Sequence, residues 1–370
     1  MIPVFSPLIT SKDIFHVLKS LLKNNLSGSS PVVKDFEEQF SDKFENRNAI
    51  AVSNGSVALD IALNVLDLND QDEVIVPSFT IISCLSAILR SGATPVFCDV
   101  DLNSWNMTIE NVKEAYSDHT KAVLVVHTYG LPADILEIKK FCDEKNIILI
   151  EDTAEAHGLR VGQKFCGTFG TVSTFSFYAN KHITTGEGGM ILTDSKTLEE
   201  KAKKMRNLDF NSKKTFIHEN LYWNYRLGGL QAALGISQLK KLDSTINFKK
   251  KQGSYYSKLF EKYQTLIQTP LESYLETQNH YWVYGIVLRI DGIRDLVIED
   301  LYNEGIETRP FFYPLHLQPA LPSKFRSKKV LLNTEHISRN GFYIPMGKHV
   351  SFKMQNKIVN TIIKSVNKFV

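Results

Sequence analysis

Cysteine is scarce in this chain of 370 residues. The four cysteines, Cys84, Cys98, Cys142 and Cys166, are widely spaced and form no CxxC pair. This spacing argues against a zinc site and against a disulfide framework. We therefore expect four buried, reduced thiols and no bound metal.

Long apolar runs and a strong charge of either sign are also missing. No apolar stretch approaches the roughly 20 residues of a membrane span, and the opening MIPVFSPLITSKDIF lacks the basic-then-apolar order of a secretory signal. The formal net charge is only +3 at pH 7, so neither a nucleic acid nor a membrane is an expected partner. These absences predict a cytoplasmic protein.

Short apolar runs alternate with helical patterns between residues 48 and 195. The runs are continuous rather than alternating, which is typical of strands buried on both faces of a sheet. Six of them predict strands: AIAV (49–52), EVIVP (73–77), AVLVVH (122–127), IILIED (147–152), STFSF (173–177) and GMILTD (189–194). This order predicts an α/β domain with a mostly parallel central sheet, which binds ligands at the carboxyl ends of its strands.

The pattern changes after Gly229. QAALGISQLKKL and STINFKKKQGSYYSKLFEKY are typical of helices, and the second is long enough to connect two domains. A strand over residues 281–290, a helix over 293–302 and a last helix after Val350 follow. We expect a large domain over residues 1–240 and a smaller α+β domain over residues 241–370.

Three short stretches could carry chemistry. VSNGSVALD places Gly55 and Ser56 at the start of a helix, where free N–H groups can hold a phosphate. IILIEDTAEAHG ends a strand in Glu151 and Asp152, and a carboxylate there can pair with a cationic ring nitrogen. Lys181 follows STFSF, and a desolvated lysine can act as a Schiff-base nucleophile.

Each stretch taken alone has an ordinary explanation: a capped turn, solvated acids or a metal site, and a surface lysine. Their combination is more specific. A phosphate turn, then an acidic strand end, then a lysine after a serine-bearing strand is the layout of the type-I fold of pyridoxal-phosphate enzymes. The order of the three stretches therefore favours Lys181 as a catalytic amine.

The sequence resembles the DegT/DnrJ-type nucleotide-sugar aminotransferases over nearly its whole length. The blocks that carry the resemblance are SGSSPVVKDFEEQF, VSNGSVALDIAL, DEVIVPSFT, GATPVFCDVD, TKAVLVVHTYGLPADI, IEDTAEAHG, GTFGTVSTFSFYANK and YRLGGLQAA. Within the family, NKHITTGEGGM and TRPFFYPLH are most similar to the perosamine synthases, which aminate GDP-4-keto-6-deoxymannose. The resemblance implies a type-I aminotransferase fold, pyridoxal 5′-phosphate (PLP) as cofactor, L-glutamate as amino donor and a role in surface polysaccharide or related glycan synthesis.

The resemblance also assigns roles by position. Lys181 would bind the cofactor covalently and later move the proton, Asp152 would pair with the pyridinium nitrogen, and Glu155 would lie near the ring hydroxyl. The remaining cofactor contacts would come from Gly55, Ser56, Val57, Phe79, Ser176 and, across the interface of a homodimer, Asn224. The candidates for substrate contacts are His182, Arg226, Arg309, Tyr313 and His316.

Several alternatives stay open from the sequence. The acceptor could be a UDP- or dTDP-linked keto-sugar, aminated at carbon 4 or carbon 3, and His182 stands where the most similar relatives tend to have threonine. A PLP-dependent sugar dehydratase is less favoured, because those enzymes carry a histidine where Lys181 stands. A non-catalytic protein would be expected to lose Lys181, Asp152 or the phosphate hydroxyls. A nicotinamide enzyme is disfavoured because GEGG does not have GxGxxG spacing.

Overall fold

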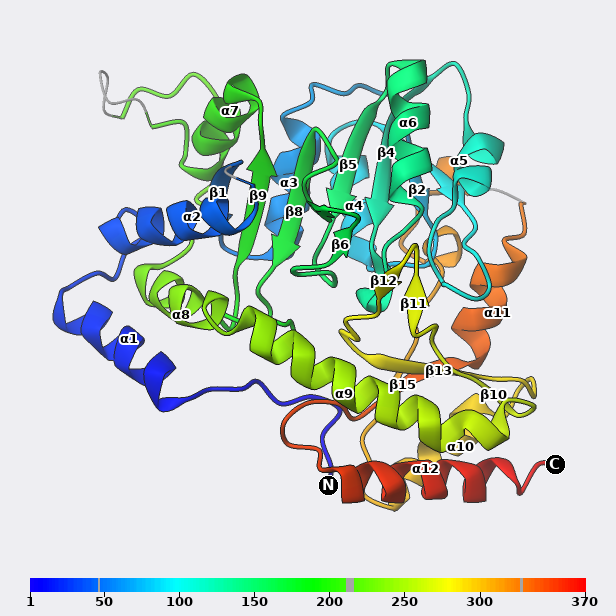
Figure 1. The fold of residues 1–370 in the computed structure, drawn as a ribbon. Coiled ribbons are helices and arrows are strands. Elements are labelled where there is room, and N and C mark those ends of the chain that lie inside the picture. The colour runs from blue at the N-terminus through cyan, green and yellow to red at the C-terminus, as the bar shows by residue number, and fades with distance from the viewer. Residues whose placement is uncertain (46, 211–215, 327–328) are drawn as a thin grey trace.

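A computed structural model of the protein describes residues 1–45, 47–210, 216–326 and 329–370. The larger part is built on a seven-stranded sheet with the order β1-β9-β8-β5-β4-β2-β3 (Figure 1). Its strands are β1 (Asn48–Val52), β2 (Glu73–Pro77), β3 (Thr94–Cys98), β4 (Thr120–Val126), β5 (Ile148–Asp152), β8 (Val172–Ser176) and β9 (Gly189–Thr193). The pairs from β3 through β8 are parallel, whereas β9 is antiparallel to both neighbours. The predicted mostly parallel sheet is confirmed.

Strand β3 was absent from the six predicted strands. It contains Pro95, whose Cα pairs with that of Val74 in the parallel β2. A proline has no N–H to donate, so it argues against a central strand. The strand lies at the edge of the sheet, where the missing donor is tolerated. The proline is therefore compatible with a strand here, and the prediction of six strands was one short.

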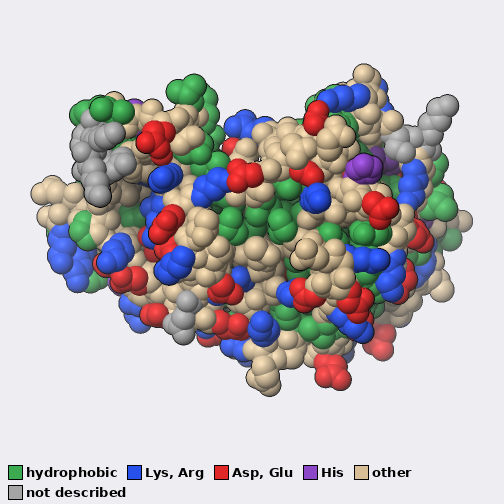
Figure 2. Space-filling view, turned by 90° about the horizontal axis from the view of Figure 1, so that it is seen from above, with side chains coloured by type: hydrophobic (Ala, Val, Ile, Leu, Met, Phe, Trp, Pro, Cys, Tyr) green, Lys and Arg blue, Asp and Glu red, His purple; other side chains and the backbone are tan. Residues whose placement is uncertain are grey.

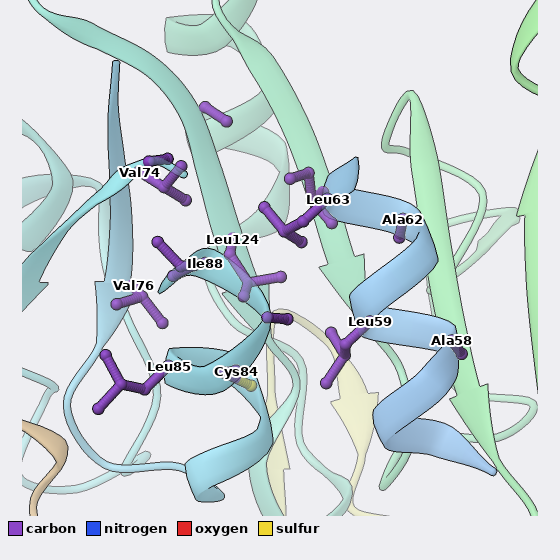
Figure 3. Packing of buried hydrophobic residues seen from close by; sticks show 14 of the residues in the cluster. Ala58, Leu59, Ala62, Leu63, Val74, Val76, Cys84, Leu85, Ile88 and Leu124 are labelled. Atoms are coloured by element: carbon purple, nitrogen blue, oxygen red, sulfur yellow. The ribbon is translucent and has the colours of Figure 1, made fainter. Parts of the chain in front are cut away.

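Helices cover both faces of this sheet. They are α3 (Gly55–Asn64) and α4 (Ile82–Arg90) on one face, and α5 (Ile109–Ala115) and α6 (Ile135–Lys145) on the other. Along β4, Leu124 packs with α3 and α4, whereas Val123 and Val125 pack with α5 and α6. Figure 3 shows Leu59 and Leu85 on the same side of the sheet as Leu124. Because both faces are covered, the middle of β2 and most of β4 and β5 form continuous apolar runs, VIV, AVLVV and ILI.

The rest of the larger part flanks this sheet. It consists of α1 (Ser11–Leu22), α2 (Pro31–Lys43), α7 (Lys196–Arg206), α8 (Gly229–Leu239) and a short hairpin, β6 (Arg160–Val161) with β7 (Lys164–Phe165). Helices α2 and α8 pack on the β1–β9 end through a cluster rich in aromatic rings. Within that cluster, Phe40 and Phe44 stack with ring centroids 4.5 Å apart.

A second, antiparallel sheet lies beyond the long helix α9 (Leu242–Phe260) (Figure 1). Its order is β10-β13-β15-β14, with β10 (Ile267–Gln268), β13 (Tyr284–Leu288), β14 (Arg309–Pro310) and β15 (Gly341–Ile344). The other elements are α10 (Arg294–Asn303), α11 (Leu332–Asn340), α12 (Phe352–Val366) and the hairpin β11 (Ser273–Tyr274) with β12 (Thr277–Gln278). The division between residues 240 and 241 stays a prediction.

The first residues of the chain lie against this second sheet rather than near α1. Ile2 forms a parallel bridge with Ile306, and the Val4 amide donates to Glu307 Oε2 at 3.0 Å. The segment that follows runs from there to α1 along the side of the molecule (Figure 1). The strands of the small sheet all come from late in the sequence, and the first residues of the chain pack beside them.

Surface and core agree with the composition. The four cysteines lie buried, as predicted. Figure 2 shows basic and acidic side chains interspersed over the face seen from above. Within the described ranges, no helix is both long enough and apolar enough to cross a membrane, and no group of three His, Cys, Asp or Glu residues is arranged to hold a metal.

Candidate active site

A pocket of about 480 Å³ opens at the carboxyl ends of β4, β5 and β8. The arrowheads of these parallel strands point toward α9 and the second sheet (Figure 1). One wall comes from the starts of α3 and α4, and the opposite wall from Trp282, Phe312 and Tyr343 of the C-terminal part. The pocket therefore lies where the topology of an open parallel sheet predicts a ligand.

Lys181 projects into this pocket from the loop after β8. Its amide donates to Tyr178 O at 2.9 Å, and its side chain is only 10% exposed. Nζ lies 3.6 Å from Glu155 Oε1 and 3.7 Å from the centroid of the Trp282 ring. Burial lowers the pKa of Lys181, against the opposing influence of Glu155 and Asp152. A neutral, nucleophilic amine is thus easier to form here than on the surface.

Asp152 ends β5 on the pocket side and is 3% exposed. Its Oδ1 accepts the Ala154 amide at 3.0 Å, and its Oδ2 accepts from the Cys84 thiol at 3.5 Å. Burial raises the pKa of Asp152, while the Ala154 amide and Lys181 lower it. A buried carboxylate without a close cation is costly, so a cationic ring nitrogen brought next to Asp152 would be well compensated.

Glu151, adjacent to Asp152, has a different environment. Its two carboxylate oxygens accept the amides of Gly167, Phe169 and Gly170 at 2.7, 2.8 and 2.6 Å, and Oε2 lies 3.1 Å from His127 Nε2. Burial opposes ionisation, but His127 and these amides hold the pKa of Glu151 below its usual value. Glu151 fixes the loop before β8, and only Asp152 lines the pocket.

Replacing Glu151 with glutamine is expected to lower the free energy of unfolding by about 3 kcal/mol, because the buried His127 loses its anionic partner. Because the folded-state pKa of Glu151 is lowered, its contribution is present above pH 4.5 and disappears as the pH falls through the folded-state value. Urea titrations of wild type and Glu151→Gln should therefore differ at neutral pH and converge in acid. A constant difference across this range would contradict the assignment.

Glu155 is the third acid at this edge of the sheet. Its Oε2 accepts the Tyr129 amide at 2.9 Å, and burial, partly offset by Lys181, raises its pKa to about 7. The group therefore changes charge near neutral pH while in contact with the Lys181 amine. It can hold or release a proton beside that amine.

The rate at which the protein captures PLP is expected to change slope near pH 7, where Glu155 titrates. Above that pH the carboxylate stabilises the Lys181 ammonium, and below it this influence is lost. Glu155→Gln should lack the change of slope, while Glu187→Gln, which alters an exposed acid of the same pocket, should keep it. Capture followed by visible absorbance across this pH range tests both, and a break that persists in Glu155→Gln would contradict the prediction.

The start of α3 forms a cradle at one end of the pocket. Asn54 caps the helix by accepting the Val57 amide at 2.9 Å through Oδ1. The amides of Gly55 and Ser56 lie in the first turn, where a helix offers them no backbone acceptor. A side chain on Gly55 would place Cβ only 2.7 Å from Ser176 Cβ. The glycine thus brings the helix start close to the Ser176 hydroxyl.

Two hydroxyls face this cradle besides Ser176. Ser56 Oγ lies 2.7 Å from Ser83 Oγ, which comes from the start of α4. Hydroxyls and free amides at a helix N-terminus suit a phosphate, and Asp152 suits a pyridinium nitrogen. The residues present therefore fit PLP, with Lys181 within the same pocket.

Four of the predicted contacts require correction. The Val57 amide already donates to Asn54, so it is not free for a phosphate. Phe79 is fully buried and packs on Tyr129 with centroids 5.7 Å apart. The pocket wall next to it is formed by Thr80 and Ile81, so the ring of Phe79 does not line the pocket.

His182 also lies outside the pocket wall that the described residues form. Its ring is 2% exposed, and its Nε2 lies 3.2 Å from His280 O. Its ring packs between those of His157 and His280, with centroids 6.1 and 6.3 Å away. Burial lowers the pKa of His182 well below its usual value, so the predicted substrate contact is corrected to a neutral core histidine.

His316 is a buried histidine with two partners rather than a substrate ligand. Its Nδ1 lies 2.7 Å from Ser78 Oγ and its Nε2 lies 3.3 Å from Glu335 Oε1. Both ring nitrogens are thereby satisfied within the protein. The prediction of a substrate contact for His316 is corrected accordingly.

The other candidates lie at the surface, outside the part of the wall that the structure describes. Arg309 pairs with Glu307 at 3.2 Å, Tyr313 is 56% exposed, and Arg226 Nε donates to Asn224 Oδ1 at 2.9 Å. Their roles, and that of Asn224 in a neighbouring subunit, stay predictions.

Several residues of the pocket were missed by sequence reasoning. They are Thr80, Ser83, Tyr178, Asn180, Glu187, Trp282, Phe312 and Tyr343. Trp282 comes just before β13, within the aromatic run YWVY. That run was a usable signal, because aromatic residues so close together at a strand start often form a wall or an anchor.

Comparison with known proteins agrees with this geometry. The sequence pattern of the DegT/DnrJ/EryC1/StrS aminotransferase family matches residues 9–363. The chain is similar to the GDP-perosamine synthase of Escherichia coli O157:H7, with 35% identity over 369 residues, which is 100% of this chain and 98% of that one.

Two solved structures share the fold. The aminotransferase TlmJ from Streptoalloteichus hindustanus has a TM-score of 0.93 and 26% identity, with 100% of both chains covered. The E. coli GDP-4-keto-6-deoxy-D-mannose-3-dehydratase with bound hydrated PLP has a TM-score of 0.89 and 27% identity, with 98% of this chain and 99% of that chain covered. Since both reactions occur on one fold, the fold alone does not separate them.

Proposed function

Because the chain belongs to the DegT/DnrJ/EryC1/StrS aminotransferase family and is a PLP-dependent sugar aminotransferase, we propose that it forms GDP-perosamine. The amino donor would be L-glutamate and the acceptor GDP-4-keto-6-deoxymannose. The observation that carries this proposal is the convergence of Lys181, Asp152 and the Ser56–Ser176 cradle on one pocket. The whole-length likeness to the E. coli GDP-perosamine synthase supports the choice of acceptor.

In this proposal the phosphate of the cofactor is held by the Gly55 and Ser56 amides and by the hydroxyls of Ser56 and Ser176. Asp152 pairs with the ring nitrogen and keeps it protonated. PLP, when bound, supplies an electron-withdrawing ring that stabilises negative charge on the carbon next to the transferred nitrogen. Ser83 adds a hydroxyl beside Ser56.

Proton movement is the task of Lys181 and Glu155. The Lys181 amine takes a proton from the carbon of the donor and returns one to the carbon of the acceptor, where the nitrogen is delivered. Glu155, 3.6 Å from Nζ, holds the proton when the amine must be neutral. Trp282, Phe312 and Tyr343 exclude water from that side of the pocket.

We also propose a cytoplasmic homodimer in which Asn224 of one subunit completes the phosphate site of the other. Asn224 directly follows Trp223 and comes three residues after Leu221, and these two side chains are 66% and 99% exposed. Exposed apolar side chains of this size favour coverage by a partner. Light scattering tests the dimer, and weaker PLP binding by Asn224→Asp tests the shared site.

Two further assignments belong to the same proposal. Residues 241–370 would form a small domain that carries the Trp282 side of the pocket. The product would serve surface polysaccharide assembly, including O-antigen and lipopolysaccharide, and Arg226, Arg309 and Tyr313 would contact the nucleotide sugar after a local rearrangement.

The second candidate function is removal of a sugar hydroxyl by a PLP-dependent dehydratase. A specific observation keeps it in view, namely the likeness to the solved dehydratase. Lys181 in the pocket favours amination instead, because a covalently bound lysine can be exchanged for an amino donor. UDP- and dTDP-linked keto-sugars are alternative acceptors in the same reaction.

The decisive experiment incubates the enzyme with L-glutamate and a panel of GDP-, UDP- and dTDP-linked keto-sugars, with products identified by mass spectrometry. We expect nitrogen gain on GDP-4-keto-6-deoxymannose and stoichiometric 2-oxoglutarate. Nitrogen gain only on another nucleotide sugar would overturn the choice of acceptor. Loss of oxygen-18 from a labelled ring hydroxyl without nitrogen gain would favour the dehydratase.

A further inference from the structure

The Lys181 amine rests on an aromatic surface that belongs to the other half of the molecule. Nζ lies 3.7 Å from the centroid of the Trp282 ring, and Trp282 is 5% exposed. An ammonium over the face of an indole is attracted by the ring quadrupole, and more strongly where water is excluded. Besides Glu155, the indole is thus a second group that holds this amine.

Both the indole ring and the backbone of Trp282 make hydrogen bonds within the protein. Its indole Nε1 donates to Asn180 O at 3.1 Å, directly before Lys181 in the chain. Its carbonyl accepts from Lys249 Nζ of α9 at 2.6 Å. The Trp282 ring also packs against Tyr129, with centroids 5.7 Å apart. The indole therefore has little freedom to leave its place beside the lysine.

This arrangement matters in a transamination cycle. This inference rests on the function proposed above, in which Lys181 alternates between a form bound to the cofactor and a free form. In the free form its flexible side chain needs a defined position. We propose that Trp282 is the docking surface for the free Lys181 amine and that Lys249 is a positioning residue that holds this surface. A lysine kept there stays within reach of the pocket for its return.

Four titratable groups face the amine besides the indole. Glu155 and Asp152 are the acids that favour its protonated form, and the pKa values of His157 and Lys249 are in turn lowered by Lys181. Burial is the larger cause for both of these. The protonation of Lys181 must therefore be compared only among variants that keep these four groups.

The first test is tryptophan emission of the full chain without cofactor, recorded against pH. The chain has three tryptophans, and an ammonium in contact with an indole alters its emission. We expect a step that is absent from Lys181→Met and Trp282→Phe and retained in Trp223→Phe, which changes an exposed ring. A step that survives Lys181→Met, or no step in the wild type, would overturn the contact.

The second test is the rate at which PLP becomes covalently attached, followed by visible absorbance. Trp282→Phe keeps an aromatic face and should stay within about threefold of wild type, whereas Trp282→Leu should be about tenfold slower. Equal rates for the two variants would overturn the docking role. Neither test uses a sugar, so failure of the proposed acceptor leaves both results interpretable.

The role of Lys249 has its own comparison. Lys249→Met should slow attachment about threefold, Lys249→Arg should restore the rate because it can still donate to the Trp282 carbonyl, and Lys250→Met is the matched neighbour that should not change it. Thermal melts show whether each variant is folded. The positioning role would be overturned if Lys249→Arg attached PLP as slowly as Lys249→Met. It would also be overturned if Lys250→Met slowed the attachment.

Discussion

Lys181→Ala is expected to lower transamination roughly 10⁴-fold and to leave the protein colourless with PLP. In the proposed function, the lysine amine binds the cofactor covalently and then moves the proton. Alanine offers neither a nucleophile nor a base. The rate of 2-oxoglutarate formation and the visible spectrum measure the two losses separately.

The control for this variant is a lysine outside the pocket. Lys139→Ala removes an exposed ion pair with Asp143 on α6, and it should keep both the colour and the rate. Lys181→Ala should also melt cooperatively, since removing a buried lysine amine relieves a desolvation penalty. A Lys181→Ala protein that still turns over at the normal rate would refute the assignment of the catalytic amine.

Asp152→Asn is expected to reduce activity roughly a hundredfold, because it removes a charge worth about 3 kcal/mol in a buried pair. Asparagine has nearly the same shape and can still accept the Ala154 amide. What it loses is the negative charge that, in the proposed function, keeps the ring nitrogen protonated. Activity and the dissociation constant for PLP should both deteriorate, and the effect should not depend on which sugar is used.

Glu151→Gln is the natural comparison, because it changes the neighbouring acid in the same way. It should lower stability with little effect on PLP affinity, whereas Asp152→Asn should do the reverse. The two variants thus separate a structural acid from a functional one. If Asp152→Asn bound PLP as tightly as wild type, the pairing with the ring nitrogen would be wrong.

The sheet and the centre of the site could be predicted from sequence because they depend on local patterns. Continuous apolar runs mark strands covered on both faces, as Val123, Leu124 and Val125 illustrate. The carboxyl ends of parallel strands meet at one edge, so Ser56, Asp152 and Lys181 could be expected to converge. Their assigned roles in binding the cofactor stay proposals.

The rest of the site depends on contacts that sequence spacing does not encode. Trp282 reaches Lys181 across 101 positions because α9 brings the second sheet against the pocket edge, and no local pattern predicts that meeting. Val57 is occupied because Asn54 happens to cap its helix. His182 and His316 were misread because a histidine's function depends on its partners, which are far away in sequence.

The bridge between Ile2 and Ile306 ties the start of the chain to the loop before β14 of the second sheet. The chain passes from one sheet region to the other before α1 and again through α9, and Leu315, Leu321 and Leu331 return to the core beside α3 and α4. Connections at several separate points restrict the rotation of one region against the other. Cutting the segment between residues 5 and 10 should remove one of these connections and so loosen the pocket wall that Trp282 provides.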